Sequence, residues 1–171
     1  LILVKGSVFM GNGFKATRKV RFVSAQIGSD LICRDGHFSE SDGDALNLQA
    51  ANIQGGFLLS DLVVPARINT TSAKIGFLVD DPTAWAKGSI LNGLIYESFG
   101  GFSPADAVHR IAWLKKQSDE DLGEDEFKQG FRPQPWRQLQ KVLREMGHFA
   151  DAREVGIAFE EQLRVADRIG Q

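Results

Sequence analysis

The segment Val20–Ile27, with the sequence VRFVSAQI, returns as Leu46–Ile53, LNLQAANI, and again, in weaker form, as Ile68–Ile75, INTTSAKI. An alanine and an isoleucine occupy the same places in all three segments. The aligned alanines are 26 and then 22 residues apart (51 − 25 and 73 − 51). Repetition at a period in the twenties indicates a solenoid, in which each coil buries its apolar side against the neighbouring coils.

A finer period of five runs inside each repeat. Large apolar residues stand five positions apart, and a second set precedes each of them by two positions. The first set is Phe22, Ile27, Ile32, Leu48, Ile53 and Leu58, and the second is Val20, Ala25, Asp30, Leu46, Ala51 and Gly56. A helix repeats about every 3.6 residues and a strand about every 2. A period of five therefore predicts a chain that turns a corner every five residues and points one large and one small side chain inward on each side.

The predicted fold is a β-solenoid of about four coils over residues 1–100, followed by an α-helical region over residues 101–171. Val4, Phe9 and Phe14 give a truncated first coil, and the polar segment Ser39–Asp44 is a loop at a corner. The alternative is a β-sandwich in which the spacing is a coincidence. The solenoid is favoured because register and residue type both recur.

Composition restricts the function. The chain has 25% charged residues and a net charge of −2, which gives no sign of a nucleic-acid-binding surface. Residues 1–102 contain nine acidic and nine basic side chains, so mimicry of DNA by an acidic rod has the least support. Cys33 is the one cysteine, which excludes an internal disulfide framework and a cysteine-based zinc cluster. The sequence shows neither a signal peptide nor an apolar run of the ~18 residues that span a bilayer.

The regular pattern weakens after the third repeat. Asp80-Asp81-Pro82 and Trp85 do not suit a coil, because proline cannot donate to a β-ladder and tryptophan is large for a crowded axis. We expect coils to about residue 79 and then one last strand pair. Its parts are Ile90–Leu91, the turn Asn92-Gly93, and Leu94–Tyr96.

The composition then changes to helix. Ser103 and Pro104 predict the N-cap and the first position of a helix that ends near Lys116. Val108, Ile111, Ala112 and Lys115 follow at helical spacing, and Trp113 and Leu114 add apolar surface. Residues 118–130 are rich in acidic side chains and are typical of a solvated loop.

Two more helices are predicted after this loop. Pro133 and Pro135 mark a helix start, and Gly147 stands where a left-handed C-terminal cap belongs. The apolar stripe between them is Trp136, Leu139, Val142, Leu143 and Met146. A third helix is expected from about residue 150 to residue 169, antiparallel to the second. The C-terminal part is therefore a three-helix region that closes the end of the solenoid.

Several motifs carry a resemblance. The phrase Ala-x-Ile-Gly occurs at Ala25–Gly28 and Ala73–Gly76, and Asp80-Asp81 is followed shortly by Trp85. The helical region contains, in order, Pro133–Trp136, Leu143-Arg144, Gly147-His148 and Asp151–Arg153. Together these motifs cover nearly the whole chain, and they resemble a group of bacterial pentapeptide-like β-solenoid proteins with a helical C-terminal region.

The resemblance implies a right-handed β-helix, further coils upstream and, in some members, hydrophobic segments downstream. It also implies membrane-associated oxidoreductase activity, by which members are often described. It supplies no catalytic residue for this chain. The sequence has no Gly-x-Gly-x-x-Gly fingerprint and no Cys-x-x-Cys, so we expect no cofactor.

Asp80 and Asp81 are the first candidate site. Adjacent carboxylates at the end of a strand can bind a cation, or can act as acid and base in sugar chemistry. The alternative is a turn in which a carboxylate accepts backbone N–H bonds before Pro82. The alternative is favoured.

The helical hairpin is the second candidate site. Trp136 can form a recognition surface, since tryptophan is enriched at binding hot spots, or it can pack at the start of its helix. Arg137 and Arg144 place basic charge on the hairpin, and His148 follows the Gly147 cap. The structural interpretation is favoured for each, and no metal site is expected.

The function that fits these features is a non-catalytic protein-interaction or scaffold module. The alternative is a polysaccharide-binding or carbohydrate-active β-helix that uses Asp80 and Asp81. The expected partner is a protein or a neighbouring domain of the same longer chain, with no nucleic acid. The expected location is the cytoplasm or the membrane periphery, with membrane contact only through flanking segments.

The start of the chain adds one expectation. Leu1 is not a methionine, and Leu1–Met10 is typical of the middle of a coil. An open solenoid end normally requires a cap. We therefore expect a fragment of a longer bacterial protein with more coils upstream; the alternative is an end covered by an oligomer partner.

Overall fold

The computed structural model describes residues 1–117 and 131–169. The acidic segment 118–130, predicted as a loop, lies outside the described residues. Within the described residues, twelve strands and one 3-10 helix precede three α-helices. The strands are β1 (Leu3–Val4), β2 (Val8–Phe9), β3 (Lys15–Ala16), β4 (Val20–Arg21), β5 (Gln26–Ile27), β6 (Leu31–Ile32), β7 (His37–Phe38), β8 (Leu46–Asn47), β9 (Asn52–Leu59), β10 (Ile68–Asn69), β11 (Lys74–Asp80) and β12 (Ile95–Phe99).

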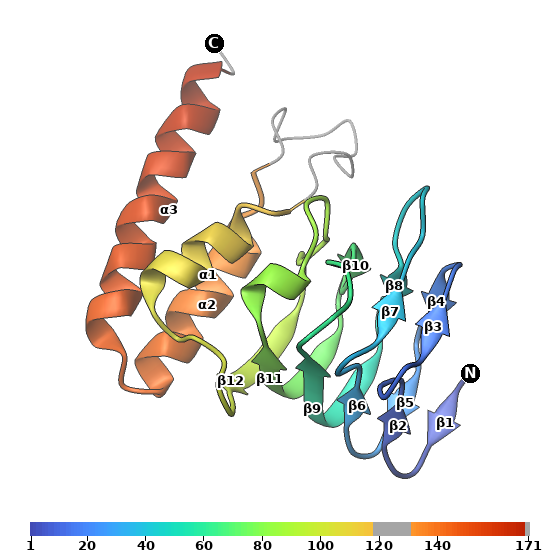
Figure 1. Cartoon of the computed structure of the whole chain (residues 1–171). Coiled ribbons are helices and arrows are strands. Elements are labelled where there is room, and N and C mark those ends of the chain that lie inside the picture. Colours follow the sequence, from blue (N-terminus) through green and yellow to red (C-terminus); the bar gives the residue numbers. More distant parts are fainter. Residues whose placement is uncertain (118–130, 170–171) are drawn as a thin grey trace.

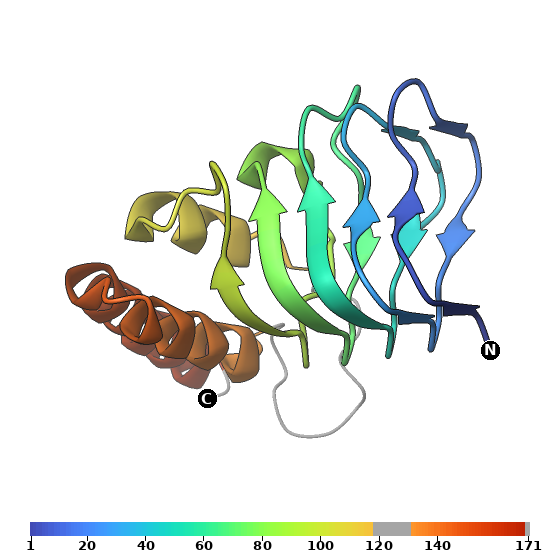
Figure 2. The ribbon, with the colours of Figure 1, turned by 90° about the horizontal axis from the view of Figure 1, so that it is seen from below.

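The strands form a solenoid of stacked parallel coils, as predicted. β1, β5, β9, β11 and β12 pair side by side in that order, and every pair is parallel. The register passes from Leu3 to Gln26, Asn52, Lys74 and Ile95. Figures 1 and 2 show the coils following one another along one axis, with β1 at one end and the helices at the other.

The repeated alanines and isoleucines form the core of these coils. Ala25, Ala51 and Ala73 are at most 1% exposed. The isoleucines stand in one column in the β-ladder, and Tyr96 continues this column in the last coil. The small alanine leaves room at the corner where the chain turns, which explains why the two residue types recur together.

The predicted period of five is wrong after these isoleucines. Ile32 and Leu58 are only half-buried, whereas the fully buried side chains are those of their neighbours Leu31, Cys33, Phe57 and Leu59. Asp30, also predicted to point inward, instead accepts a hydrogen bond from the backbone N–H of Gly56 at 2.7 Å. One extra residue at this corner shifts the inward positions by one, because successive strand residues face opposite sides.

A left-handed residue forms the corner before each core alanine. Ser24, Ala50 and Ser72 have φ angles of 56°, 55° and 55°, and Gly93 has 77° at the matching place in the last coil. The residue after each of them donates its backbone N–H to the residue three positions earlier, as in Ala25 to Phe22 at 3.0 Å. These turns set the corner geometry of each coil.

The solenoid continues past residue 79, which corrects the predicted strand pair. Ile90 bridges to Asn69 in parallel, and β12 pairs in parallel with β11. Asn92-Gly93 is therefore a coil corner and not a hairpin turn. Trp85, expected not to suit a coil, bridges in parallel to Ala66 and is 1% exposed, and the 3-10 helix η1 (Pro82–Ala84) lies between it and β11.

The first helix, α1 (Ala107–Leu114), begins later than predicted, with Asp106 as its N-cap. Ser103 does not cap the helix, because its hydroxyl accepts from the N–H of Asp80 at 2.7 Å and donates to the carbonyl of Leu78 at 3.2 Å. The predicted apolar side of this helix is correct only in part: Val108 is 78% exposed, whereas Trp113 and Leu114 are each 1% exposed. The buried side chains of α1 are Ala107, Arg110, Trp113 and Leu114.

The other two helices agree with the sequence interpretation. They are α2 (Pro133–Glu145) and α3 (Phe149–Ile169). Gly147 between them has a φ of 83°, the left-handed conformation expected of a C-terminal cap. Of the five predicted stripe residues, Trp136, Leu139, Val142 and Leu143 are buried and Met146 is partly buried. All three helices lie at the end of the solenoid next to β12 (Figure 1).

Candidate functional site

Asp80, the first predicted site residue, lies inside the core. It pairs with Leu59 in the β-ladder and occupies an inward position that apolar residues hold in earlier coils. The Arg110 guanidinium donates to both of its carboxylate oxygens, at 3.0 and 2.6 Å, and neither side chain is exposed. The indole N–H of Trp85 donates to the same carboxylate at 2.8 Å. A buried ion pair needs such additional hydrogen bonds to offset its desolvation.

Arg110 is satisfied on its remaining sides. Its Nε donates to the carbonyl of Pro104 at 2.7 Å, and its guanidinium carbon lies 3.7 Å from the centre of the Phe99 ring. Because every acceptor of Asp80 is occupied by these internal donors, its carboxylate has no exposed oxygen for a cation or a substrate. Through Arg110, Asp80 links β11 to α1, a contact that the sequence interpretation did not predict.

Asp81 has the capping role that was favoured from the sequence. Its Oδ1 accepts the N–H of Thr83 at 2.9 Å and caps η1. The Lys116 ammonium also binds this segment, because it donates to the carbonyls of Pro82 and Trp85 at 2.6 and 2.8 Å. Burial lowers the pKa of Lys116, while the nearby carboxylates of Asp81 and Asp80 oppose that shift.

The hairpin residues are not gathered into one site. Trp136 is 3% exposed and packs against Phe131 and Phe159, with ring centres 6.1 and 6.4 Å away. Trp136 therefore stabilises the hairpin from within and forms no surface.

The three predicted polar residues of the hairpin are exposed and make local contacts. The Arg137 guanidinium lies 5.9 Å from the Phe159 ring centre. Arg144 donates to Gln140 at 3.3 Å, one turn earlier on α2. His148 lies 3.8 Å from Asp151. Such contacts at a solvated surface contribute little to stability.

The edge of the last coil carries contacts that the sequence interpretation missed. Gln138 donates to the carbonyl of Tyr96 at 2.7 Å. Gln134 donates to the carbonyl of Leu94 at 3.1 Å and accepts the N–H of Gly93 at 2.7 Å. The Met146 sulfur accepts the N–H of Phe99 at 3.4 Å. One face of α2 thus satisfies the backbone along the edge of β12, which would otherwise attract another strand.

The opposite end of the solenoid has apolar side chains in contact with solvent. Leu3 in β1 is 68% exposed and Phe9 in β2 is 74% exposed. Figure 2 shows β1 and β2 in the coil farthest from the helices. Leu3 and Phe9 both stand at outward positions, because Leu3 pairs with Gln26 and Phe9 with Ile32. The open end itself is marked by the inward residues Val4 and Val8, which are only partly buried.

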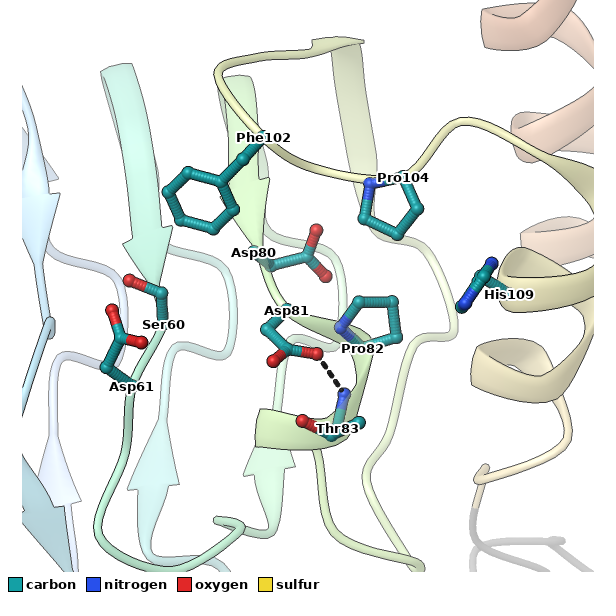
Figure 3. A pocket seen from close by; sticks show the side chains of 9 residues that line it. All are labelled: Ser60, Asp61, Asp80, Asp81, Pro82, Thr83, Phe102, Pro104 and His109. Atoms are coloured by element: carbon teal, nitrogen blue, oxygen red, sulfur yellow. Dashed lines mark hydrogen bonds between the residues drawn. The ribbon is translucent and has the colours of Figure 1, made fainter.

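A hollow of about 520 Å³ lies beside η1, where the coils meet the start of α1. It is lined by Ser60, Asp61, Asp80, Asp81, Pro82, Thr83, Phe102, Pro104 and His109 (Figure 3). Phe102 is 57% exposed, and His109 lies 2.8 Å from the carboxylate of Asp106. Neither Phe102 nor His109 was predicted to belong to a site, because both stand alone in the sequence.

Among residues 1–117 and 131–169, no cluster of three or more His, Cys, Asp or Glu side chains has the arrangement of a metal site. In the same described part of the chain, no helix is both long enough and apolar enough to cross a membrane. No protein-family model, curated protein or solved structure matches this chain.

Proposed function

We propose that the chain is a non-catalytic interaction module, whose first coil docks a β-coil of a protein partner or of a neighbouring domain. The difference between the two ends of the solenoid carries this proposal. Gln134, Gln138 and Met146 cover the edge of the last coil. The first coil instead leaves Val4 and Val8 only partly buried, in columns whose next members, Ile27 and Leu31, are at most 1% exposed.

The backbone of the first coil has the geometry of an edge that can accept a strand. The carbonyls of Ile2 and Val4 accept the N–H groups of Gln26 and Gly28, both at 2.8 Å. In a parallel ladder, the N–H and C=O of the residue between them point to the other side. The backbone groups of Leu3 therefore face away from the second coil, and the same argument applies to Phe9 between Val8 and Met10.

The shape of this end favours a coil as the occupant. Val4, Val8 and Phe14 are only partly buried, although they stand in or beside columns that are fully buried one coil later. A strand added to a sheet edge gains backbone hydrogen bonds, and its alternate side chains fill the apolar columns. Another parallel coil does both along every side of the solenoid.

The test compares two double variants of the chain as baits. Val4→Lys with Val8→Lys places charge in the inward columns that an added coil would continue, which opposes strand addition. Val108→Lys with Ile157→Lys places the same charge on exposed positions of α1 and α3. Proteins captured from lysate, membranes included, are identified, purified and mixed with each variant. Amide hydrogen exchange is then measured for the complex.

The expected result is slower exchange in residues 2–10 on binding, with binding lost only in the edge variant. A partner that binds the edge variant as well as the unaltered chain contradicts the proposal. If the unaltered chain forms dimers by itself and the edge variant does not, the edge binds a second copy of this chain and not a different protein.

The finer expectations from the resemblance have less support. Oxidoreductase chemistry through a thiol needs a reactive Cys33, but this side chain is 0% exposed and burial raises the pKa of its thiol above the ordinary value. The thiolate is the reactive form of cysteine, so Cys33 fits a packing role. A place at the membrane periphery and membership of the pentapeptide-like group rest on the sequence motifs alone.

A further inference from the structure

The hollow beside η1 combines an aromatic platform with polar groups from distant parts of the chain. Ser60 and Asp61 follow β9, Asp81–Thr83 belong to the η1 turn, and Phe102 lies before α1. Figure 3 shows Ser60 and Asp61 on one side, His109 on the other, and Phe102 and Pro104 along one rim. Its volume of about 520 Å³ is that of a small-molecule site.

Phe102 is available to a ligand. Its side chain is 57% exposed, unlike the aromatic rings of Trp85, Phe99 and Trp113 nearby, which are at most 7% exposed. The Arg34 guanidinium lies 5.9 Å from the Phe102 ring centre, and its Nε donates to the Ser60 hydroxyl at 3.3 Å. An exposed aromatic ring held at the rim of a hollow offers a flat face for packing.

Both hydrogen-bond donors and acceptors lie near this platform. The carboxylate of Asp61 accepts, and so does Asp81, which uses one oxygen to cap η1. The guanidinium of Arg34 donates. His109 uses Nδ1 toward Asp106, which leaves its Nε2 for another partner. The hollow can thus both donate to a ligand and accept from it.

The lining of the hollow is acidic on balance. Arg110 neutralises Asp80, which leaves the carboxylates of Asp61 and Asp81, while Arg34 stands beside the hollow against Ser60 and Phe102. An anionic ligand would therefore meet groups of its own sign. A ligand that both donates and accepts, with one apolar face, suits the hollow better.

A pyranose ring has these properties, because its hydroxyls surround a face of C–H bonds that packs on an aromatic ring. We propose that the hollow binds one or two pyranose units of a neutral saccharide, with Phe102 as the platform and Asp61, Asp81, Arg34 and His109 as polar contacts. The site is separate from the open first coil, so the two proposals can fail independently.

The experiment titrates the purified full chain with free glucose, galactose, mannose, N-acetylglucosamine and their disaccharides. Saturation-transfer NMR detects binding, and calorimetry measures affinity. We expect at least one saccharide to bind with a Kd of about 1 mM, as one platform and a few hydrogen bonds allow. Phe102→Ala should weaken binding about tenfold, and Phe102→Trp should retain it.

Matched controls separate this site from a change in folding. Phe149→Ala removes a ring that is 67% exposed on α3 and should leave saccharide binding unchanged. Far-ultraviolet circular dichroism of each variant checks the fold. The proposal is overturned if no saccharide binds below about 50 mM, or if Phe102→Ala and Phe149→Ala bind equally well. Nα-acetyl-lysine methylamide keeps its charged ε-ammonium and serves as a cationic probe. Selective binding of this probe would overturn the proposal in favour of a peptide side chain as the ligand.

Discussion

Arg110 reaches from α1 into the solenoid core and binds both carboxylate oxygens of Asp80, which stands 30 residues earlier in β11. Both side chains are fully buried. The pair, together with Trp85 and the Pro104 carbonyl, replaces the apolar contact that earlier coils make at this position. The helical region is thereby joined to the coils by charge as well as by packing.

Removing one member of this pair should be costly. Asp80→Ala leaves the Arg110 cation buried, and the free energy of unfolding should fall by about 3–5 kcal/mol. The double variant Asp80→Leu with Arg110→Met should recover most of that loss, because no charge remains in the core. Urea unfolding followed by tryptophan fluorescence measures Asp80→Ala, the double variant and its two component single variants, Asp80→Leu and Arg110→Met. Strictly additive effects would contradict coupling between the two residues.

The cover of the last coil can be tested at Gln138. Gln138→Leu keeps an apolar contact but leaves the Tyr96 carbonyl without its donor, so stability should fall by about 1–3 kcal/mol. Lys141→Leu, at an exposed position of the same helix, is the control and should change stability little. Thermal unfolding of both variants distinguishes them. Equal midpoints would show that the hydrogen bond to Tyr96 contributes nothing.

The left-handed corners predict a stabilising substitution. Ala50 has a φ of 55°, where an alanine is strained and a glycine is not. Ala50→Gly should raise the free energy of unfolding by about 0.5–1 kcal/mol, net of the added freedom of the unfolded chain. Ala112→Gly, the same change at an exposed position of α1, should lower it by about 1 kcal/mol. Chemical unfolding should give these opposite signs, and a loss at both sites would contradict the turn assignment.

Cys33 should resist thiol reagents while the chain is folded. Burial raises the pKa of its thiol and blocks access. Dithionitrobenzoate should therefore react slowly in native buffer, and at once with one thiol per chain in strong denaturant. Fast reaction of the folded chain would show that Cys33 lies at an accessible place.

Ionised Asp106 should stabilise the folded state at neutral pH, and acid should remove this contribution to the free energy of unfolding. Partial burial raises the pKa of Asp106, but the hydrogen bonds from the backbone and ring of His109 outweigh this and hold it below the ordinary 3.8. The lowered pKa stabilises the folded state above the unfolded value, and this contribution disappears as the pH falls through the folded value.

Asp106→Asn keeps an N-cap oxygen but loses the charge. The variant should therefore be less stable than the unaltered chain at pH 7, and the difference should shrink as the pH is lowered through and below 3.8. Unfolding free energies at several pH values measure this. A difference that stays constant with pH would contradict the charge effect.

The repeated phrase was enough to predict the coils, because its alanine and isoleucine occupy core positions that recur at fixed sequence spacing. The pairs that join the helices to the coils could not be predicted in this way. Asp80 and Arg110 are 30 residues apart, and Tyr96 and Gln138 are 42 apart, with no spacing rule that connects them. Arg110 also misled the helix prediction, because a buried arginine interrupts the apolar stripe by which α1 was aligned.

The glutamines of α2 have a consequence for assembly. Because they occupy the edge of the last coil, a second molecule cannot stack its first coil there. The helical region therefore gives the stack of coils a direction, because β-addition by another chain is blocked beyond β12.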